Sequence, residues 1–282
     1  WHSGVMHRPF LTVDVFGERP YLGNPLAVVL DAEGITDEQM QRFANWTNLS
    51  ETTFLLPPTD PAADYRVRIF TTTQELPFAG HPTLGSCHAW LAHGGTPRQS
   101  ERIVQECGVG LVPVRRTGPG RLAFAAPPMR RTGPLDRATL LAATAALGID
   151  PEDVVDAVWI DNGPGWIGLL LPTAAEVLAI TPGDSDLAIG VVGPHRAGAP
   201  HAYEVRGFFP ADGKTFEDPV TGSLQASVAQ WLIASGRVTP PYVAAQGTVL
   251  GRAGRVHIDV DAGGDVWVGG LVTTCITGTV RS

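Results

Sequence analysis

The chain repeats itself at long range, and this internal repeat is the feature that most restricts its possible folds. Three kinds of segment recur in the same order: a strand–turn–strand, an alternating strand carrying V-R-x-F, and a glycine turn leading into a helix that ends in Trp-Leu. The pairs are 11–30 with 158–172, 63–74 with 201–212, and 79–91 with 220–232. The matched residues Leu30/Leu170, Arg68/Arg206 and Trp90/Trp231 are 140, 138 and 141 positions apart. This near-constant spacing predicts two homologous halves, divided near the Pro/Arg-rich stretch 124–134.

Short β-strands dominate both halves. Most candidate segments are β-branched or alternating, and Gly, Pro or Asp bounds them. In the first half they are 11–16, 26–30, 53–56, 65–70, 102–107, 110–115 and 121–125; in the second half they are 157–161, 166–171, 188–192, 202–208, 242–250, 254–260 and 265–271. Surface helices are predicted over 36–47, 137–147 and 173–180, the first with Thr36 as its N-cap and acidic residues in its first turn.

Two further segments, each after a glycine turn, have the pattern of buried helices. PTLGSCHAWLAH from Pro82 and SLQASVAQWLIASG from Ser223 are small and apolar on most sides. A helix without a broad polar face is typically buried. We therefore expect an α+β fold of two pseudo-symmetric halves, each a curved, mostly antiparallel sheet or barrel around a central helix.

The predicted boundaries are 6–127 for the N-terminal half and 128–271 for the C-terminal half, with a last strand near 272–282 joining the first half. Both central helices are expected to point their N-termini at a cleft between the halves.

Composition narrows the possible partners. The hydrophobic fraction of 44% allows a large core, and the net charge of −8 disfavours nucleic acid and anionic membranes, which both attract basic surfaces. A few backbone N–H groups can still hold a small anionic substrate. No apolar run approaches the roughly 20 residues that span a bilayer.

The three cysteines, Cys87, Cys107 and Cys275, are far apart and form no C-x-x-C pair. We therefore expect neither a metal site nor a disulfide framework, which favours a reducing, cytoplasmic compartment. The first ten residues lack the pattern of a signal peptide. Met6 is interpreted as the native start, and residues 1–5 are set aside as a remnant.

The starts of the two central helices are candidate anion sites. Gly80-His81-Pro82 opens the first helix and Thr221-Gly222-Ser223 opens the second. The first N–H groups of a helix lack internal partners, and together with the helix dipole they attract a carboxylate. The alternative is that both are ordinary helix starts in which Thr83 or Ser223 serves as the cap.

Three titratable side chains lie close to these starts or at a strand edge. His81 exchanges protons near neutral pH, and Asp218 lies five residues before Ser223. Glu51 precedes an apolar strand, where partial desolvation raises the pKa of a carboxyl toward that of a working base. The alternatives are a surface residue at a strand start for Glu51 and an Asp-Pro turn for Asp218. No G-x-S-x-G elbow and no Walker A motif is present.

Taken together, these motifs resemble the PhzF-like phenazine biosynthesis family. The stretches that carry the resemblance are VDVFGERPYLGNPLAVVL, NLSETTFLLP, RVRIFTTTQELPFAGHPTLGS and FEDPVTGSLQASVAQWL. They occur in the family's order, and the resemblance as a whole extends over nearly the whole chain. The resemblance implies a diaminopimelate epimerase-like fold, a homodimer, and no metal or organic cofactor. One difference is Phe70-Thr71-Thr72, where the family often has Phe-Thr-Pro.

The resemblance also implies a chemistry and a set of site residues. In the best-understood branch, the enzyme isomerises trans-2,3-dihydro-3-hydroxyanthranilate, and other members belong to antibiotic pathways. A carboxylate removes a proton from one ring carbon and returns one at another; the resemblance assigns this part to Glu51. His81 and Asp218 match residues that contact and orient the substrate. Gly80, Gly222 and Ser223 match those that hold its polar groups.

Two other functions stay open on the same scaffold. A racemase or epimerase of this fold uses two cysteines at the helix starts, but Ala79 and Pro219 occupy the approximate equivalents here, and Cys87 lies about two turns into its helix. A non-catalytic protein that binds a small carboxylate is the second alternative.

Overall fold

The computed structural model describes residues 6–100, 102–211 and 213–281. The set-aside residues 1–5 lie outside this part. The chain divides into two compact units: unit 1 contains the described residues up to Ala125 together with those from Gly269, and unit 2 is Ala126–Val268. The C-terminal half predicted from the sequence, 128–271, therefore differs from unit 2 by two residues at its start and three at its end.

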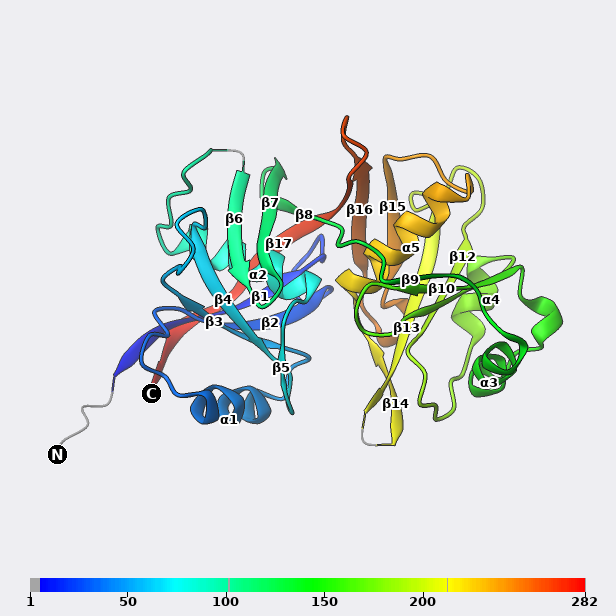
Figure 1. The fold of residues 1–282 in the computed structure, drawn as a ribbon, viewed down its shortest axis with the longest axis horizontal. Helices are drawn as coiled ribbons and strands as arrows, with labels where there is room; N and C mark the ends of the chain where they lie inside the picture. The colour runs from blue at the N-terminus through cyan, green and yellow to red at the C-terminus, as the bar shows by residue number, and fades with distance from the viewer. Residues whose placement is uncertain (1–5, 101, 212, 282) are drawn as a thin grey trace. The chain divides into compact units, whose positions relative to one another are not determined.

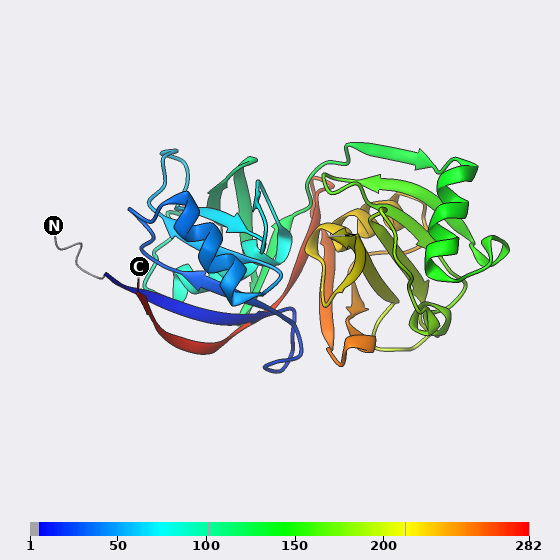
Figure 2. The ribbon, with the colours of Figure 1, turned by 90° about the horizontal axis from the view of Figure 1, so that it is seen from below.

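Unit 1 is a closed barrel of eight strands (Figure 1). The ring runs β1–β2–β3–β4–β6–β7–β8–β17 and closes where β17 pairs with β1. Its strands are β1 (His7–Val15), β2 (Asn24–Val29), β3 (Thr52–Leu56), β4 (Tyr65–Phe70), β6 (Arg102–Cys107), β7 (Gly110–Gly118), β8 (Arg121–Ala125) and β17 (Val266–Arg281), with the two-residue β5 (Glu75–Leu76) attached to β4. Helix α1 (Asp37–Thr47) contacts β3 and β4 from outside the barrel (Figure 2).

Unit 2 repeats this arrangement of strands. They are β9 (Arg131–Pro134), β10 (Asp156–Asp161), β11 (Ile167–Leu170), β12 (Ile189–Pro194), β13 (Tyr203–Ala211), β14 (Lys214–Asp218), β15 (Tyr242–Gln246) and β16 (Gly254–Val260). Its helices are α3 (Arg137–Leu147), α4 (Ala174–Ala179) and α5 (Gly222–Ala234), with short 3-10 helices at Pro151–Asp153 and Thr248–Leu250.

The ladder order shows the duplication directly. In unit 1 antiparallel and parallel pairs alternate around the barrel. The antiparallel pairs are β1/β2, β3/β4 and β6/β7, and the parallel pairs are β2/β3 and β4/β6. Unit 2 shows the same alternation. Its antiparallel pairs are β10/β11, β12/β13 and β15/β16, and its parallel pairs are β11/β12 and β13/β15. A parallel pair needs a crossover, and the second crossover of each unit carries the central helix.

The central helices are α2 (Gly80–Ala92) and α5, and both are buried along most of their length. In unit 1, α2 contacts strands all around the barrel, including β1, β2, β3 and β8. Space inside the barrel is tight: a Cβ on Gly85 of α2 would lie 2.5 Å from Leu26 and 3.0 Å from Val13. A small-residue helix therefore fits where an amphipathic helix would not.

Most predicted elements are present, and the mixed α+β architecture is confirmed. Thr36 caps α1 in a capping box with Gln39. The strand predicted to reach residue 250 is wrong at its end, because β15 stops at Gln246. Gly247 and Gly251 adopt left-handed φ angles of 88° and 70° around a short 3-10 helix.

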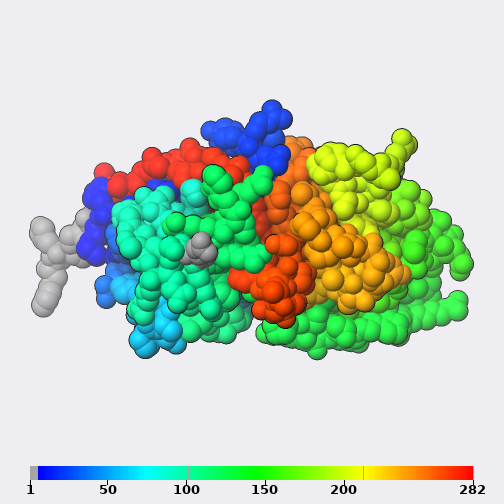
Figure 3. Space-filling view, turned by 90° about the horizontal axis from the view of Figure 1, so that it is seen from above, coloured from blue at the N-terminus to red at the C-terminus, as the bar shows by residue number. Residues whose placement is uncertain are grey.

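Three short strands have no sequence signal and were not predicted: β5, β9 and β14. The strands predicted at 265–271 and near 272–282 form one continuous strand, because β17 runs to Arg281 as the partner of β1 (Figure 2). Figure 3 shows this end of the chain, in red, lying at the surface, consistent with the exposed residues 276–279. Among the described residues, no helix combines the length and apolarity needed to cross a membrane.

Candidate active site

Unit 1 brings Glu51 and His81 together. Glu51 immediately precedes β3, and its side chain is 16% exposed. Its Oε2 lies 3.5 Å from Nδ1 of His81, the second residue of α2. The two predicted residues, 30 positions apart in the sequence, are therefore neighbours at one end of the central helix.

Burial makes the His81 imidazole a neutral group. The residue is only 3% exposed, and desolvation lowers its pKa from 6.5 to about 3, although a hydrogen bond with the backbone of Pro25 acts in the opposite direction. At neutral pH the ring therefore offers one N–H donor and one nitrogen acceptor. Its Nε2 is buried and has no hydrogen-bond partner among the described residues.

Asn24 is a third member of this cluster. Its Nδ2 lies 3.5 Å from Nδ1 of His81, and the side chain is fully buried. The preceding loop is held by Asp14, whose carboxylate accepts hydrogen bonds from the backbone N–H groups of Leu22 and Gly23. A Cβ on Gly23 would lie 2.2 Å from the Val15 carbonyl oxygen, so only glycine fits there. Loop geometry thus sets the position of Asn24.

Unit 2 holds Asp218 at the end of β14, just before α5. The hydroxyl of Thr221 donates to Asp218 Oδ2 at 2.7 Å. The buried amide of Gln246 supports the same turn: Nε2 donates to the Asp218 carbonyl and to Thr221 Oγ1, while Oε1 accepts from the Thr221 N–H. This network fixes both the carboxylate and the start of α5.

Ser223 is the second residue of α5. Its Oγ accepts a hydrogen bond from the indole Nε1 of Trp166 at 3.1 Å, and its carbonyl accepts one from Asn162 Nδ2 at 2.9 Å. With the indole as donor, the Ser223 hydroxyl keeps its own hydrogen for donation.

Neither central helix starts with a side-chain cap. The N-cap residues are Ala79 and Thr221, and neither makes a side-chain cap bond. The Thr83 hydroxyl donates to the Ala79 carbonyl instead, and the Ser223 hydroxyl receives the Trp166 indole. The alternative that Thr83 or Ser223 caps these helices is therefore wrong. Gly80 and Gly222 begin the two helices.

The cysteines are not placed as acid–base groups. All three are free, and burial raises the pKa of the Cys87 thiol to about 12. Burial also raises the pKa of Cys107 and of Cys275. The described residues contain no group of three or more His, Cys, Asp or Glu side chains placed to hold a metal ion.

Sequence reasoning missed the supporting residues Asn24, Trp166, Thr221 and Gln246. Gln105 in unit 1 donates to Thr83 Oγ1, but it is not the counterpart of Gln246. Gln105 lies opposite Tyr65 in the β4/β6 ladder, whereas Tyr203, which matches Tyr65 in the repeat, lies opposite Ala244 in the β13/β15 ladder. The repeat therefore gave no signal for Gln246. Trp166 lies in the glycine-rich stretch GPGWIG, residues 163–168, where no site residue was predicted.

A family model described as "Phenazine biosynthesis-like protein" matches residues 13–278. The chain belongs to this family. A relative from Schizosaccharomyces pombe named "Antisense-enhancing sequence 1" is 37% identical over 95% of this chain and 97% of its own length. The trans-2,3-dihydro-3-hydroxyanthranilate isomerase of Pseudomonas aeruginosa is 33% identical over 92% of each chain.

Solved structures agree with this assignment. The PhzF-family phenazine biosynthesis protein of Bacillus anthracis superposes with a TM-score of 0.81 at 21% identity, covering 98% of this chain and 99% of that one. A hydroxyproline epimerase from Agrobacterium vitis shares the fold at 14% identity, with a TM-score of 0.56 and coverage of 98% and 92%. The predicted epimerase-like fold is confirmed, and the named relatives support an isomerase.

Proposed function

We propose that the chain is a cofactor-independent isomerase that shifts a proton and a double bond in a small unsaturated cyclic amino or imino acid. Its relatives in three Pseudomonas species carry the name trans-2,3-dihydro-3-hydroxyanthranilate isomerase. Other relatives carry different names, so the substrate is proposed as a class of compound.

The observation that carries the proposal is the mostly buried Glu51 carboxylate beside a neutral imidazole. General base catalysis is most effective when the pKa of the base lies near the working pH. His81, with a pKa of about 3, is too weak a base for that task. Glu51 is then the group that removes the proton from one carbon and returns it to another, and His81 orients the substrate by hydrogen bonding.

Asp218, Gly80, Gly222 and Ser223 are proposed to hold the polar groups of the substrate. The hydroxyl of Ser223 offers a donor, and the carboxylate of Asp218 accepts from an amino or imino group. Backbone N–H groups at a helix start favour a carboxylate. A substrate with both an amine and a carboxylate matches the Asp218 carboxylate and the backbone N–H groups at the start of α5.

The test follows carbon-bound protons by NMR in deuterated water. Candidate amino and imino acids, beginning with trans-2,3-dihydro-3-hydroxyanthranilate, are incubated with the wild-type protein and with Glu51→Gln. Loss of the base is expected to slow exchange and turnover by about 10²–10⁴-fold. Glu38→Gln, which changes an exposed carboxylate on α1, is the control and keeps wild-type rates. Full turnover by a folded Glu51→Gln protein would remove Glu51 from the mechanism.

A racemase on the same scaffold predicts a different outcome: deuterium incorporation with inversion at the α-carbon, together with sensitivity to thiol reagents. The buried Cys87, with its pKa of about 12, gives this alternative no thiolate. A carboxylate-binding protein predicts binding without any exchange. The homodimer and the cytoplasmic location stay predictions.

A further inference from the structure

We propose that Arg206 and Glu217 are positioning residues for Asp218, and that Arg68 and Glu75 serve the strand leading to His81 in the same way. The inference rests on the proposed function, in which Asp218 and His81 contact the substrate. The four residues form two equivalent Arg–Glu pairs, one in each unit.

The pair in unit 2 is bidentate and almost fully buried. Arg206 donates from Nε and Nη2 to the two carboxylate oxygens of Glu217 at 2.9 and 2.7 Å, and the side chains are 2% and 10% exposed. The remaining Nη1 donates to the carbonyls of Val177 and Ile180, at the end of α4. The guanidinium also lies over the ring of Phe208, 4.9 Å from its centroid. Every nitrogen of the guanidinium therefore has a hydrogen-bond acceptor.

This arrangement adds an anchor at Glu217 to a strand that is held at its start by hydrogen bonds between Thr215 and residues 184–185. β14 is a five-residue hairpin strand paired with β13, where Phe208 lies opposite Glu217 and Gly207 lies opposite Asp218. Phe216 on the same strand is 46% exposed. Glu217 directly precedes Asp218, so the Arg206 pair fixes the backbone from which the Asp218 carboxylate extends.

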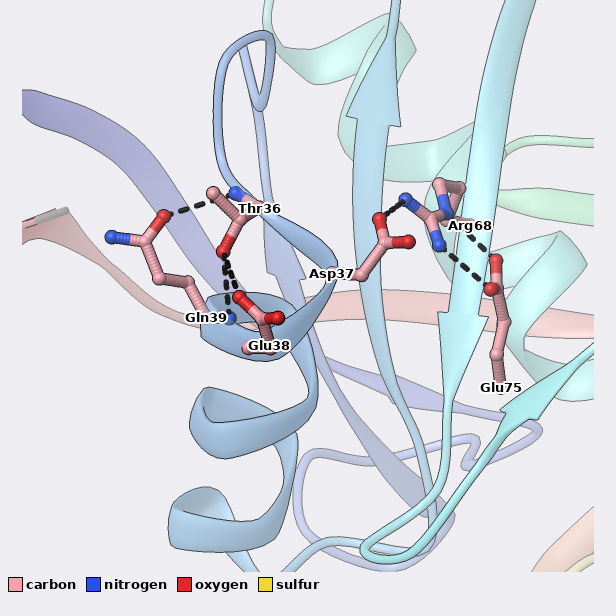
Figure 4. Close-up of polar contacts among 6 residues, drawn as sticks. All are labelled: Thr36, Asp37, Glu38, Gln39, Arg68 and Glu75. Carbon is pink, nitrogen blue, oxygen red and sulfur yellow. Dashed lines mark hydrogen bonds and ion pairs between the residues drawn. The ribbon is translucent and has the colours of Figure 1, made fainter.

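Unit 1 contains an equivalent Arg–Glu pair, and its residues occupy the corresponding positions of the strand ladder. Arg68 donates from Nε and Nη2 to the two oxygens of Glu75 at 2.7 Å each, and its Nη1 lies 2.5 Å from Asp37 at the start of α1 (Figure 4). Its guanidinium lies 5.1 Å from the ring centroid of Phe70, which is opposite Glu75 in the ladder. Glu75 starts the short segment that leads to Gly80 and His81.

The two pairs differ in burial, and this difference predicts unequal effects. Arg68 is 23% exposed and Glu75 is 40% exposed, and five residues separate Glu75 from His81. Removing the Arg68 pair should therefore disturb its site residue less than removing the Arg206 pair disturbs Asp218. Replacing a buried ion pair by apolar residues of similar size is often neutral for stability, so an effect of this pair on the geometry of β14 can be measured apart from its effect on stability.

The test replaces both members of the buried pair. Glu217→Gln alone leaves the Arg206 charge buried without its partner, so the single variant is expected to unfold readily. The double variant Arg206→Leu/Glu217→Leu removes both charges and is expected to fold, with a lower melting temperature because the carbonyls of Val177 and Ile180 lose the Arg206 donor. If the pair positions Asp218, kcat for trans-2,3-dihydro-3-hydroxyanthranilate falls by at least about 10-fold with KM little changed. Amide hydrogen exchange at Thr221–Leu224 becomes faster at the same time.

Asp156→Asn is the matched control, because it breaks the ion pair with Arg237 beyond the opposite end of α5. It should leave both kcat and exchange at Thr221–Leu224 unchanged. A folded double variant with wild-type kcat and wild-type exchange overturns the proposal. If the wild type turns over no candidate substrate, the proposed function fails, and the exchange at Thr221–Leu224 alone decides whether the pair fixes this turn.

Discussion

At the scale of single residues, His81 shows how position changes chemistry. A histidine in water has a pKa of about 6.5, near neutrality. Inside unit 1, desolvation lowers this pKa to about 3. The ring therefore enters any reaction near pH 7 as a neutral hydrogen-bonding group, and the neighbouring Glu51 carboxyl is the proposed base.

This depressed pKa predicts a pH dependence of stability. When His81 is released on unfolding, its pKa returns to about 6.5, so the unfolded state takes up a proton first as the pH falls. The contribution of His81 to the free energy of unfolding is complete above pH 6.5 and is lost progressively toward pH 3, by up to about 1.4 kcal/mol per pH unit. Denaturant unfolding between pH 7 and pH 4 measures this slope.

The variant His81→Gln should unfold with a smaller pH slope than the wild type. His93→Gln, which replaces a histidine that is 43% exposed, is the control for the loss of a histidine from the same unit. NMR gives an independent measurement, because the His81 ring protons should not shift between pH 5 and pH 8. A wild-type titration of that ring near pH 6.5 would contradict its neutral state.

At the scale of elements, the central helix α2 depends on small residues. Its side chains face the barrel strands on most sides, and nine of its thirteen residues are buried. Gly85 lies where α2 approaches β1 and β2 most tightly, with Leu26, Val13 and Val15 within 3.2 Å of an added Cβ. Packing of this kind sets the distance between the helix and the strands.

Gly85→Ala should therefore destabilise the protein. Overpacking of a filled core costs about 1–3 kcal/mol, which exceeds the gain of up to about 1 kcal/mol from replacing a helical glycine by alanine. Chemical denaturation measures the net loss. Gly278→Ala on β17 is the control: an added Cβ there meets nothing within 4 Å, so its effect should stay within about 0.5 kcal/mol. An equal or higher stability of Gly85→Ala would show that the barrel relaxes around the helix.

At the scale of the whole molecule, the chain leaves unit 1 after Ala125 and returns to it at Gly269. The returning segment of β17 pairs with β1 from Val15 to His7 and, together with its pairing to β8, closes the barrel. Closure removes the free edges that an open sheet would expose. Unit 1 therefore needs the last residues of the chain as well as the first.

A chain shortened after Leu271 tests this dependence. It keeps unit 2 and loses the strand that pairs with β1, so unit 1 should lose its cooperative unfolding transition. Near-UV circular dichroism and denaturant unfolding measure the change. Two intact transitions, or one transition at the wild-type midpoint, would show that β17 is dispensable for unit 1.

The sequence by itself determined the duplication, the two buried helices and their glycine starts. These properties depend on local pattern: strand alternation, apolar periodicity and turn residues are all visible within short windows. Glu51, His81 and Asp218 could be proposed from the sequence because each lies beside one of these recognisable features. The strands β5, β9 and β14 could not, because two to five residues without alternation give no local signal.

Only the tertiary structure decided which groups meet. The contacts of the site join residues up to 57 positions apart in the sequence. They are the contacts of Asn24 and Glu51 with His81, the hydrogen bonds of Thr221 and Gln246 to Asp218, and the Arg206–Glu217 pair. Burial is likewise a property of the folded chain, and it is burial that makes His81 neutral. Sequence pattern fixes the direction of a side chain within its own element, whereas its neighbours and its solvation depend on how the elements pack.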